Sequence, residues 1–139
     1  MNGGSLGDML DSAELVAFVA CRDLEASHRF YGGVLGLRRV HASPAANVYD
    51  VAGRQLRVTE AAEPVSAPYT VLGWNVEDIE ATVRELADAG VELRRYDGFD
   101  QDEHAIWTTP GGTRVAWFAD PDGNVLSVQQ LGDDEQAVG

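Results

Sequence analysis

Apolar and polar positions alternate along the chain in a pattern that predicts the same order of elements twice. An apolar run over 15–21 predicts a buried strand, and Asp23 then caps a helical pattern that stops at Gly36. A second apolar run over 69–76 is followed by another helical pattern over 78–89. A strand followed by a helix therefore opens each half of the chain.

Shorter alternating segments follow each helical pattern. They predict three strands in each half, at 38–41, 47–51 and 55–59 in the first and at 91–96, 113–119 and 124–130 in the second. The segment 97–112 has no clean period and predicts a long loop. Loops of this length inside small domains often carry function.

Two short segments that recur in the sequence indicate that one unit has been duplicated. Asp23-Leu24-Glu25-Ala26 returns 55 residues later as Asp78-Ile79-Glu80-Ala81, at the start of each helix. Asp50-Val51-Ala52-Gly53 returns 70 residues later as Asp120-Pro121-Asp122-Gly123, before the last strand of each half. We therefore expect a pseudo-symmetric α+β fold of two tandem βαβββ modules, with a site between the halves.

The 139 residues suit one domain with a sizeable core. We expect this domain to span 14–131, with modules 14–62 and 69–131, a proline-containing linker 63–68, a flexible tail 1–13 and a flexible acidic tail 132–139.

The amino-acid composition limits which binding partners and which cellular compartment are expected. The formal net charge of −13 disfavours nucleic acid and anionic membranes, since both need basic patches. The single cysteine, Cys21, excludes an internal disulfide and is expected to be a small buried filler. The longest apolar run is too short to cross a bilayer, and the first 13 residues lack the basic residue of a signal peptide. We expect a cytoplasmic protein.

Several motifs make the chain similar to the vicinal oxygen chelate superfamily, which includes glyoxalase I, extradiol dioxygenases, fosfomycin-resistance enzymes and bleomycin-binding proteins. They are Arg22-Asp23-Leu24-Glu25 leading to Phe30-Tyr31, Leu35-Gly36-Leu37, Val76-Glu77-Asp78-Ile79, and the hairpin from Trp117 to Asn124. The resemblance implies a cupped mixed sheet with the helices on its outer face. It does not fix an activity, because this fold hosts many chemistries.

In metal-dependent members of that superfamily, each half supplies two ligands to one divalent ion. The corresponding positions here, seven residues before each helix cap and four after each hairpin glycine, are Val16, Val71, Arg57 and Ser127. Valine cannot ligate, arginine stays cationic, and a lone serine is a poor ligand. We therefore predict no metal, no other cofactor and no catalytic residue set.

Alternation along the strands predicts which side chains face the cup. Pairing across a turn at 120–123 would place Ala116 and Phe118 inside and Trp117 outside. The predicted ligand-binding residues are Val16, Phe18, Arg57, Val71, Asn75, His104, Trp107, Phe118, Ser127 and Gln129.

Each polar residue of this set has an alternative role in the fold. For Gln129, an internal hydrogen bond is the preferred alternative. Arg57 could pair with a ligand carbonyl, phenolate or carboxylate, or with Glu60 or Asp97. Trp107 could stack on a flat ligand or pack beneath the loop.

By resemblance to bleomycin-binding members, the leading hypothesis is a homodimeric, metal-free protein that sequesters a small aromatic or polycyclic antibiotic or natural product. One alternative is a glyoxalase- or dioxygenase-like enzyme, a lyase or isomerase, with an unorthodox metal site. A second enzyme alternative is metal-free chemistry in which Arg57 supplies electrostatic stabilisation. A further alternative is an accessory protein with a vestigial cup.

Overall fold

The computed structural model describes residues 5–135 and shows the duplicated unit. The first module begins with a strand, continues through a helix whose second half is a π-helix, and ends with three antiparallel strands. Its elements are β1 (Val16–Cys21), α2 (Leu24–His28), η1 (Arg29–Val34), β2 (Arg38–Ala42), β3 (Ala46–Val51) and β4 (Arg54–Glu60).

The second module repeats this order with one change. Its elements are β5 (Thr70–Asn75), α3 (Ile79–Asp88), β6 (Trp107–Thr108), β7 (Arg114–Ala119) and β8 (Val125–Gln130). The strand predicted over 91–96 is wrong, since Arg94 makes a single bridge to Trp117. The edge strand of this sheet is instead β6, which lies inside the segment predicted as a loop.

Each module forms a mixed four-stranded sheet in which a parallel pair joins the first strand to the last. The strand orders are β1-β4-β3-β2 and β5-β8-β7-β6. Phe18 lies opposite Arg57 in the first sheet as Gly73 lies opposite Ser127 in the second. These pairs are related by the shifts of 55 and 70 residues, so the pairing register confirms the duplication.

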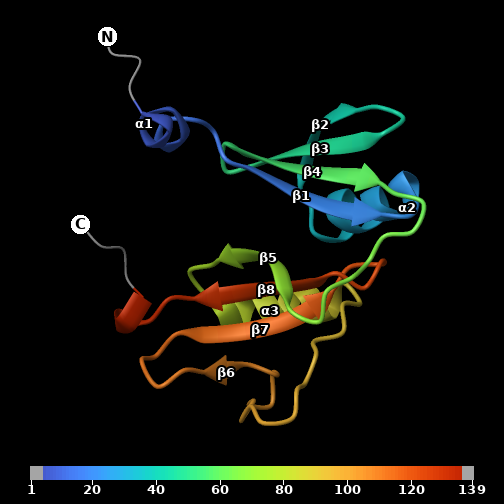
Figure 1. Ribbon diagram of the computed structural model, residues 1–139. Coiled ribbons are helices and arrows are strands. Elements are labelled where there is room, and N and C mark those ends of the chain that lie inside the picture. Colours follow the sequence, from blue (N-terminus) through green and yellow to red (C-terminus); the bar gives the residue numbers. More distant parts are fainter. Residues whose placement is uncertain (1–4, 136–139) are drawn as a thin grey trace.

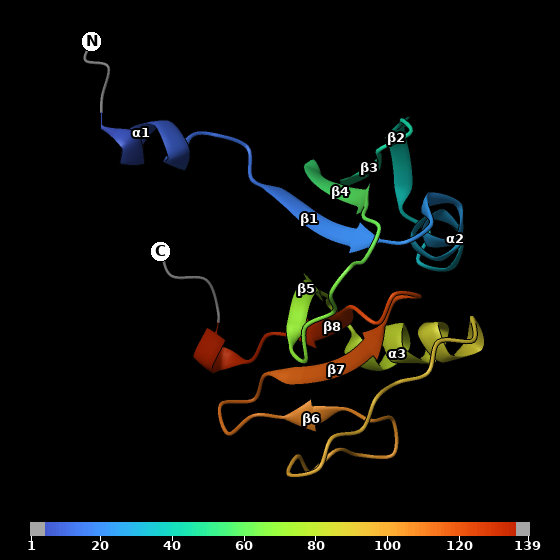
Figure 2. The same cartoon turned by 45° about the vertical axis from the view of Figure 1, so that its right-hand side comes forward.

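The helices of both modules cover the same side of the two sheets. Figure 1 shows the helix-free faces of both sheets toward the viewer, with β1 and β5 next to one another in the middle of the view and the helices behind. Figure 2 shows α2 and α3 on one side of the sheets. This arrangement confirms the expected fold class, two modules forming a cupped mixed sheet with helices on its outer face.

Both long helical segments begin where the sequence predicts, because an aspartate caps each of them. The Asp23 carboxylate accepts hydrogen bonds from the backbone N–H groups of Glu25 and Ala26, and the Asp78 carboxylate accepts one from Ala81. Such caps satisfy backbone donors that have no partner within the helix. They also complement the positive end of the helix dipole.

One continuous apolar core lies between the sheets and the helices. Its largest fully buried side chains include Tyr31 and Tyr49 from the first module and Phe118 and Ile79 from the second. Cys21 is fully buried, which confirms it as a filler. Burial, followed by repulsion from nearby Asp122, raises the pKa of the Cys21 thiol to about 11, so it stays protonated at neutral pH.

The turn between β7 and β8 connects the two modules through the carboxylate of Asp120. Asp120 Oδ2 accepts hydrogen bonds from the Tyr31 hydroxyl at 2.6 Å and from Asn124 Nδ2 at 2.8 Å. Its Oδ1 accepts the backbone N–H groups of Asp122 and Asn124 at 2.9 and 3.0 Å. Asn124 Nδ2 also donates to the carbonyl of Ala20, and Asp122 accepts the backbone N–H of Arg22. The first module is therefore bonded to this turn at three points.

The same turn reverses the predicted orientation of β7. Asn124 stays in the turn, so Ala119 pairs with Val125 and the connection has one residue more than was assumed. Trp117 consequently lies opposite Ser127 on the helix-free face, and Phe118 lies in the core. The prediction that Ala116 and Phe118 face the cup was wrong.

The two ends carry short helices where the sequence suggested none. Residues 6–11 form α1 (Leu6–Asp11), which begins with a capping box at Ser5 and lies apart from the sheets in Figures 1 and 2. Residues 133–135 form a 3₁₀ turn, η2 (Asp133–Glu135). The flexibility of both tails stays a prediction, and parts of them lie outside the described residues. Between residues 5 and 135, no helix combines the length and apolar character that a membrane span requires.

We predict that Asp120→Asn lowers the free energy of unfolding by about 3 kcal/mol. An amide cannot accept on both sides, so its NH₂ group would face either two backbone donors or the donors of Tyr31 and Asn124. Tyr31→Phe, which removes one donor, should cost about 1.5 kcal/mol. Urea unfolding of both variants and the double variant measures the coupling. Costs that simply add would show that the two groups do not interact.

Candidate functional site

The helix-free faces of the two sheets are open in part, with buried side chains such as Val48 and Ser127 between exposed ones. On β1, Phe18 is 63% exposed, and on β5, Val71 is 42% exposed. Large apolar side chains left exposed on a small domain are typical of an interaction surface. The candidate site is therefore the pair of open faces that carries most of the predicted ligand-binding residues.

On the first module, Arg57 lies at the centre of the open face. It lies between Phe18 on β1 and Val48 on β3 in the sheet register, and it is partly buried. Its guanidinium forms no ion pair with any described residue, so neither Glu60 nor Asp97 is its partner. An arginine held in this way is a cation ready for an anionic or carbonyl group of a ligand.

On the second module, three predicted polar residues form one hydrogen-bonded chain. Ser127 Oγ donates to Gln129 Oε1 at 2.9 Å, and Gln129 Nε2 donates to Asn75 Oδ1 at 2.8 Å. The preferred alternative for Gln129, an internal hydrogen bond, is what the structure shows. Asn75 ends the chain on the exposed side, so a ligand would meet its amide first.

Gly73 makes room for this polar chain. A Cβ at Gly73 would lie 2.7 Å from Ser127 Oγ and 3.2 Å from Gln129 Oε1. The equivalent residue in the first module is Phe18, whose side chain covers that face. One half of the repeat therefore presents an aromatic ring and a cation, and the other presents hydrogen-bonding groups.

Beside the polar chain lies a group of four aromatic rings, Tyr96, Phe99, Trp107 and Trp117. The ring of Phe99 lies 4.7 Å from Trp107 and 5.3 Å from Trp117 between centroids, and the two indoles are stacked at 6.3 Å. Tyr96 meets Trp117 edge-on at 5.3 Å. Trp107 thus packs against the loop, and its indole and that of Trp117 remain partly exposed beside the amides.

The loop that carries Phe99 and Trp107 is held by its own polar side chains. Gln101 donates to the carbonyls of Arg94 and Ala105 and accepts from the N–H of Tyr96. Asp102 accepts the backbone N–H groups of His104 and Ile106. These bonds fix a segment that lacks a regular strand or helix over most of its length. Side chains on such a loop keep a defined position.

His104 is the predicted site residue least connected to the others. Its side chain is half exposed, and Nε2 lies 3.9 Å from a carboxylate oxygen of neighbouring Glu103. No ring contact or hydrogen bond joins the imidazole to Trp107 in the described chain.

The strand register places Val16, Arg57 and Ser127 on the helix-free faces, with Val71 at a register shift of β5, and the chemistry of all four positions does not fit a divalent ion. Val16 and Val71 offer no donor, and Arg57 would repel a cation. The remaining hydroxyl, that of Ser127, is already engaged with Gln129. Within residues 5–135 no group of three or more His, Cys, Asp or Glu side chains is arranged to hold a metal. The donor set therefore disagrees with a metal-dependent mechanism.

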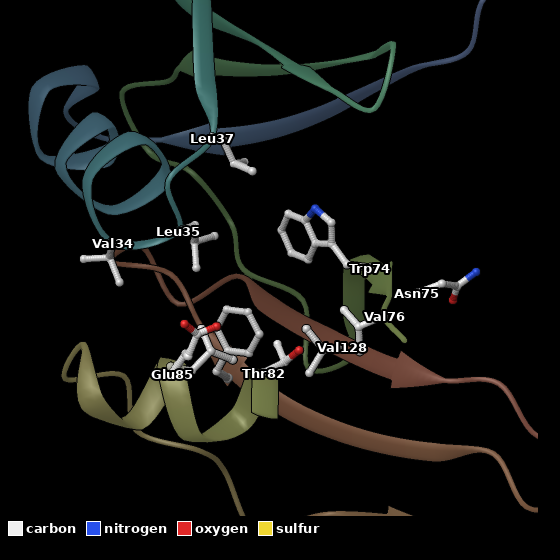
Figure 3. Close-up of a pocket in the computed structure, with 11 residues that line it drawn as sticks. Val34, Leu35, Leu37, Trp74, Asn75, Val76, Thr82, Glu85 and Val128 are labelled. Atoms are coloured by element: carbon white, nitrogen blue, oxygen red, sulfur yellow. The ribbon is translucent and has the colours of Figure 1, made fainter. Parts of the chain in front are cut away.

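Phe118 lies on the other side of the sheet from the rest of the predicted set. It is 1% exposed and forms part of the wall of a cleft between the modules on the helix side, shown in Figure 3. Trp117, Phe99 and Tyr96, in contrast, lie at the candidate site, although none of them was among the predicted site residues. The aromatic residues of the loop were the available signal for Phe99 and Tyr96. Trp117 was missed because the turn between β7 and β8 was taken to be one residue shorter, which placed Trp117 on the wrong face of the sheet.

Comparison with known proteins agrees with this architecture. The sequence profile of the Glyoxalase/Bleomycin resistance protein/Dioxygenase superfamily matches residues 13–128. No curated protein matches the chain.

Among solved structures, the chain is similar to a glyoxalase family protein from Bacillus anthracis, with 17% identity, a TM-score of 0.67 and coverage of 86% of this chain and 94% of the other. It is similar to a lactoylglutathione lyase from Agrobacterium tumefaciens, with 16% identity, a TM-score of 0.67 and coverage of 86% of this chain and 93% of the other. It is also similar to a glyoxalase/bleomycin resistance protein from Catenulispora acidiphila, with 24% identity, a TM-score of 0.65 and coverage of 86% of this chain and 99% of the other. At these identities the likeness shows the fold alone.

We predict that Gly73→Ala breaks the polar chain. The new methyl group would force Ser127 Oγ away from Gln129, at a cost of about 1 kcal/mol for the lost hydrogen bond. Gly33→Ala is the control, because nothing lies within 4 Å of a Cβ there. Thermal unfolding should show a lower midpoint for the first variant alone. Equal midpoints for both variants would contradict the tight contact at Gly73.

Proposed function

Because the chain belongs to the Glyoxalase/Bleomycin resistance protein/Dioxygenase superfamily, we propose that it binds a flat aromatic small molecule on its open faces without a metal. The observation that supports this most directly is the aromatic group next to the Asn75–Gln129–Ser127 chain. Apolar rings with a few fixed polar groups are the usual composition of a small-molecule site.

The two modules offer complementary contacts to such a ligand. The exposed parts of Trp107 and Trp117 favour a flat ring, because offset or edge-on aromatic packing adds about 0.5–1.5 kcal/mol to area burial. The amide of Asn75 orients a polar substituent. Arg57 of the first module favours a carbonyl, phenolate or carboxylate group, with Phe18 beside it.

Sequestration of an aromatic or polycyclic antibiotic or natural product is the function that these contacts support best. The bound molecule would be released unchanged, as suits a site with no suitable metal ligands. The alternative in the same family is a metal-free reaction in which Arg57 stabilises developing negative charge. A ligand recovered chemically changed would select the enzyme. The absence of binding to any aromatic compound would select an accessory protein. A cytoplasmic location remains a prediction.

We predict that Trp107→Ala weakens binding of anthracene-2-carboxylate about tenfold, since 1.4 kcal/mol corresponds to one decade. Arg57→Ala should weaken it at least as much, because a charged hydrogen bond is worth about 1.5–3 kcal/mol. Arg54→Ala, on the same strand but facing away from Arg57, is the matched control and should bind normally. Tryptophan fluorescence follows the titration. If Arg57→Ala and Arg54→Ala bound anthracene-2-carboxylate equally tightly, Arg57 would not be part of the binding site.

We also propose that a second copy of the chain covers part of the exposed apolar surface. Leu6, Met9 and Leu10 lie on one side of α1 and are 58–70% exposed, and Leu15 and Phe18 farther along the chain are 78% and 63% exposed. An isolated helix of six residues is unstable in water, so packing against another surface is expected to support it. Two-fold pairing would bring the same surface from both copies together.

We predict that light scattering at micromolar concentration gives about twice the 15.0 kDa chain mass. Leu10→Ser and Leu15→Ser should shift the protein toward monomer, because each removes apolar area from the interface. Val65→Ser is the control: Val65 is 89% exposed on the linker, away from α1 in sequence. A monomeric wild-type protein would refute the dimer, and equal effects of all three variants would refute this interface.

A further inference from the structure

We propose a second binding site on the helix side of the protein, for a small apolar cation such as a protonated amine on an aromatic body. The site is the cleft between the modules, with a volume of about 490 Å³. Cavities of 300–1,000 Å³ are the usual size for small-molecule ligands. Most of its lining lies on the opposite side of the sheets from the open faces, and Asn75, at the end of β5, borders both sites.

Both modules contribute to the walls of this cleft. The first module supplies Leu35 and Leu37, which follow the π-helix, and the second supplies Trp74 on β5 and Glu85 on α3. Figure 3 shows the Trp74 indole extending from β5 beneath Leu37, with Glu85 on the helix across from it. A ligand here would contact two modules at once.

The interior of the cleft is apolar and firmly packed. Phe118, Val128 and Leu86 are 1%, 4% and 8% exposed, respectively, and belong to the core. Trp74 packs against that core and remains partly exposed toward the cleft. The floor therefore offers a rigid apolar surface, and the indole offers a face to a ring or to a cation.

The charge of the occupant follows from the polar groups at the rim. Glu85 is the charged residue among those that line the cleft, and no described residue forms an ion pair with it. The Thr82 hydroxyl is already donated to the carbonyl of Asp78, and the amide oxygen of Asn75, the other polar lining residue, accepts from Gln129. An unpaired carboxylate opposite an indole favours a cation over a neutral or anionic molecule, and the net charge of −13 acts in the same direction.

The proposal is tested with three probes of the same ring and different charge: 1-naphthylmethylamine, 1-naphthalenemethanol and 1-naphthoate. The readout is the set of assigned indole N–H resonances in a ¹H–¹⁵N spectrum. We expect the amine to bind more tightly than the alcohol and the acid, and to shift Trp74 while leaving Trp107 and Trp117 unchanged.

Glu85→Gln should weaken binding of the amine about fivefold, as expected for a partly exposed charge pair. Asp88→Asn, on the same helix but outside the cleft, is the matched control and should leave the affinity unchanged. The proposal is overturned if the acid binds as tightly as the amine, if Glu85→Gln and Asp88→Asn behave alike, or if the amine shifts only Trp107 and Trp117. Because the open-face ligand is monitored by different indoles, failure here leaves the proposed function standing.

Discussion

The hydrogen bonds accepted by the Asp120 carboxylate hold the arrangement on which the rest of the structure depends. Four donors converge on it, and one of them, the Tyr31 hydroxyl, comes from the other module. Burial and the nearby carboxylate raise the pKa of Tyr31, so the hydroxyl stays protonated and remains a donor. Buried charges are tolerated only when they are bonded in this way. Because the turn also holds the end of β1 through Asn124, the two sheets keep their open faces on the same side.

Because the two modules are duplicates, their helix-free faces occupy equivalent positions. The two faces differ in chemistry because the residues at those positions have diverged. Phe18 and Arg57 occupy in the first module the places of Gly73 and Ser127 in the second. The loss of a side chain at Gly73 leaves space for hydrogen bonds between amides and a hydroxyl, whereas Phe18 and Arg57 present a ring and a charge. At the four positions expected for metal ligands, Val16 and Val71 carry no donor, Arg57 carries a cation, and the Ser127 hydroxyl is bonded to Gln129. This difference is the physical basis for preferring binding over metal-assisted chemistry.

Local sequence signals predicted most of the fold, and long-range contacts account for the errors. The helix caps at Asp23 and Asp78 act within a few residues and were confirmed, whereas alternation misplaced a strand over 91–96 and the orientation of β7. The orientation of Trp117 depends on Asn124 remaining in the turn, and Asn124 does so because it bonds Asp120 and the distant carbonyl of Ala20. Likewise, the aromatic group forms only when the loop folds back over β7. No periodicity in the sequence encodes either contact.

Ligand binding to the helix-free faces is tested most directly by the assigned indole N–H resonances. Titration with anthracene-2-carboxylate should shift the signals of Trp107 and Trp117 and leave that of Trp74, on the other side of the sheet, unchanged. Saturable binding that shifts Trp74 alone, or that moves none of the three, would contradict the claim.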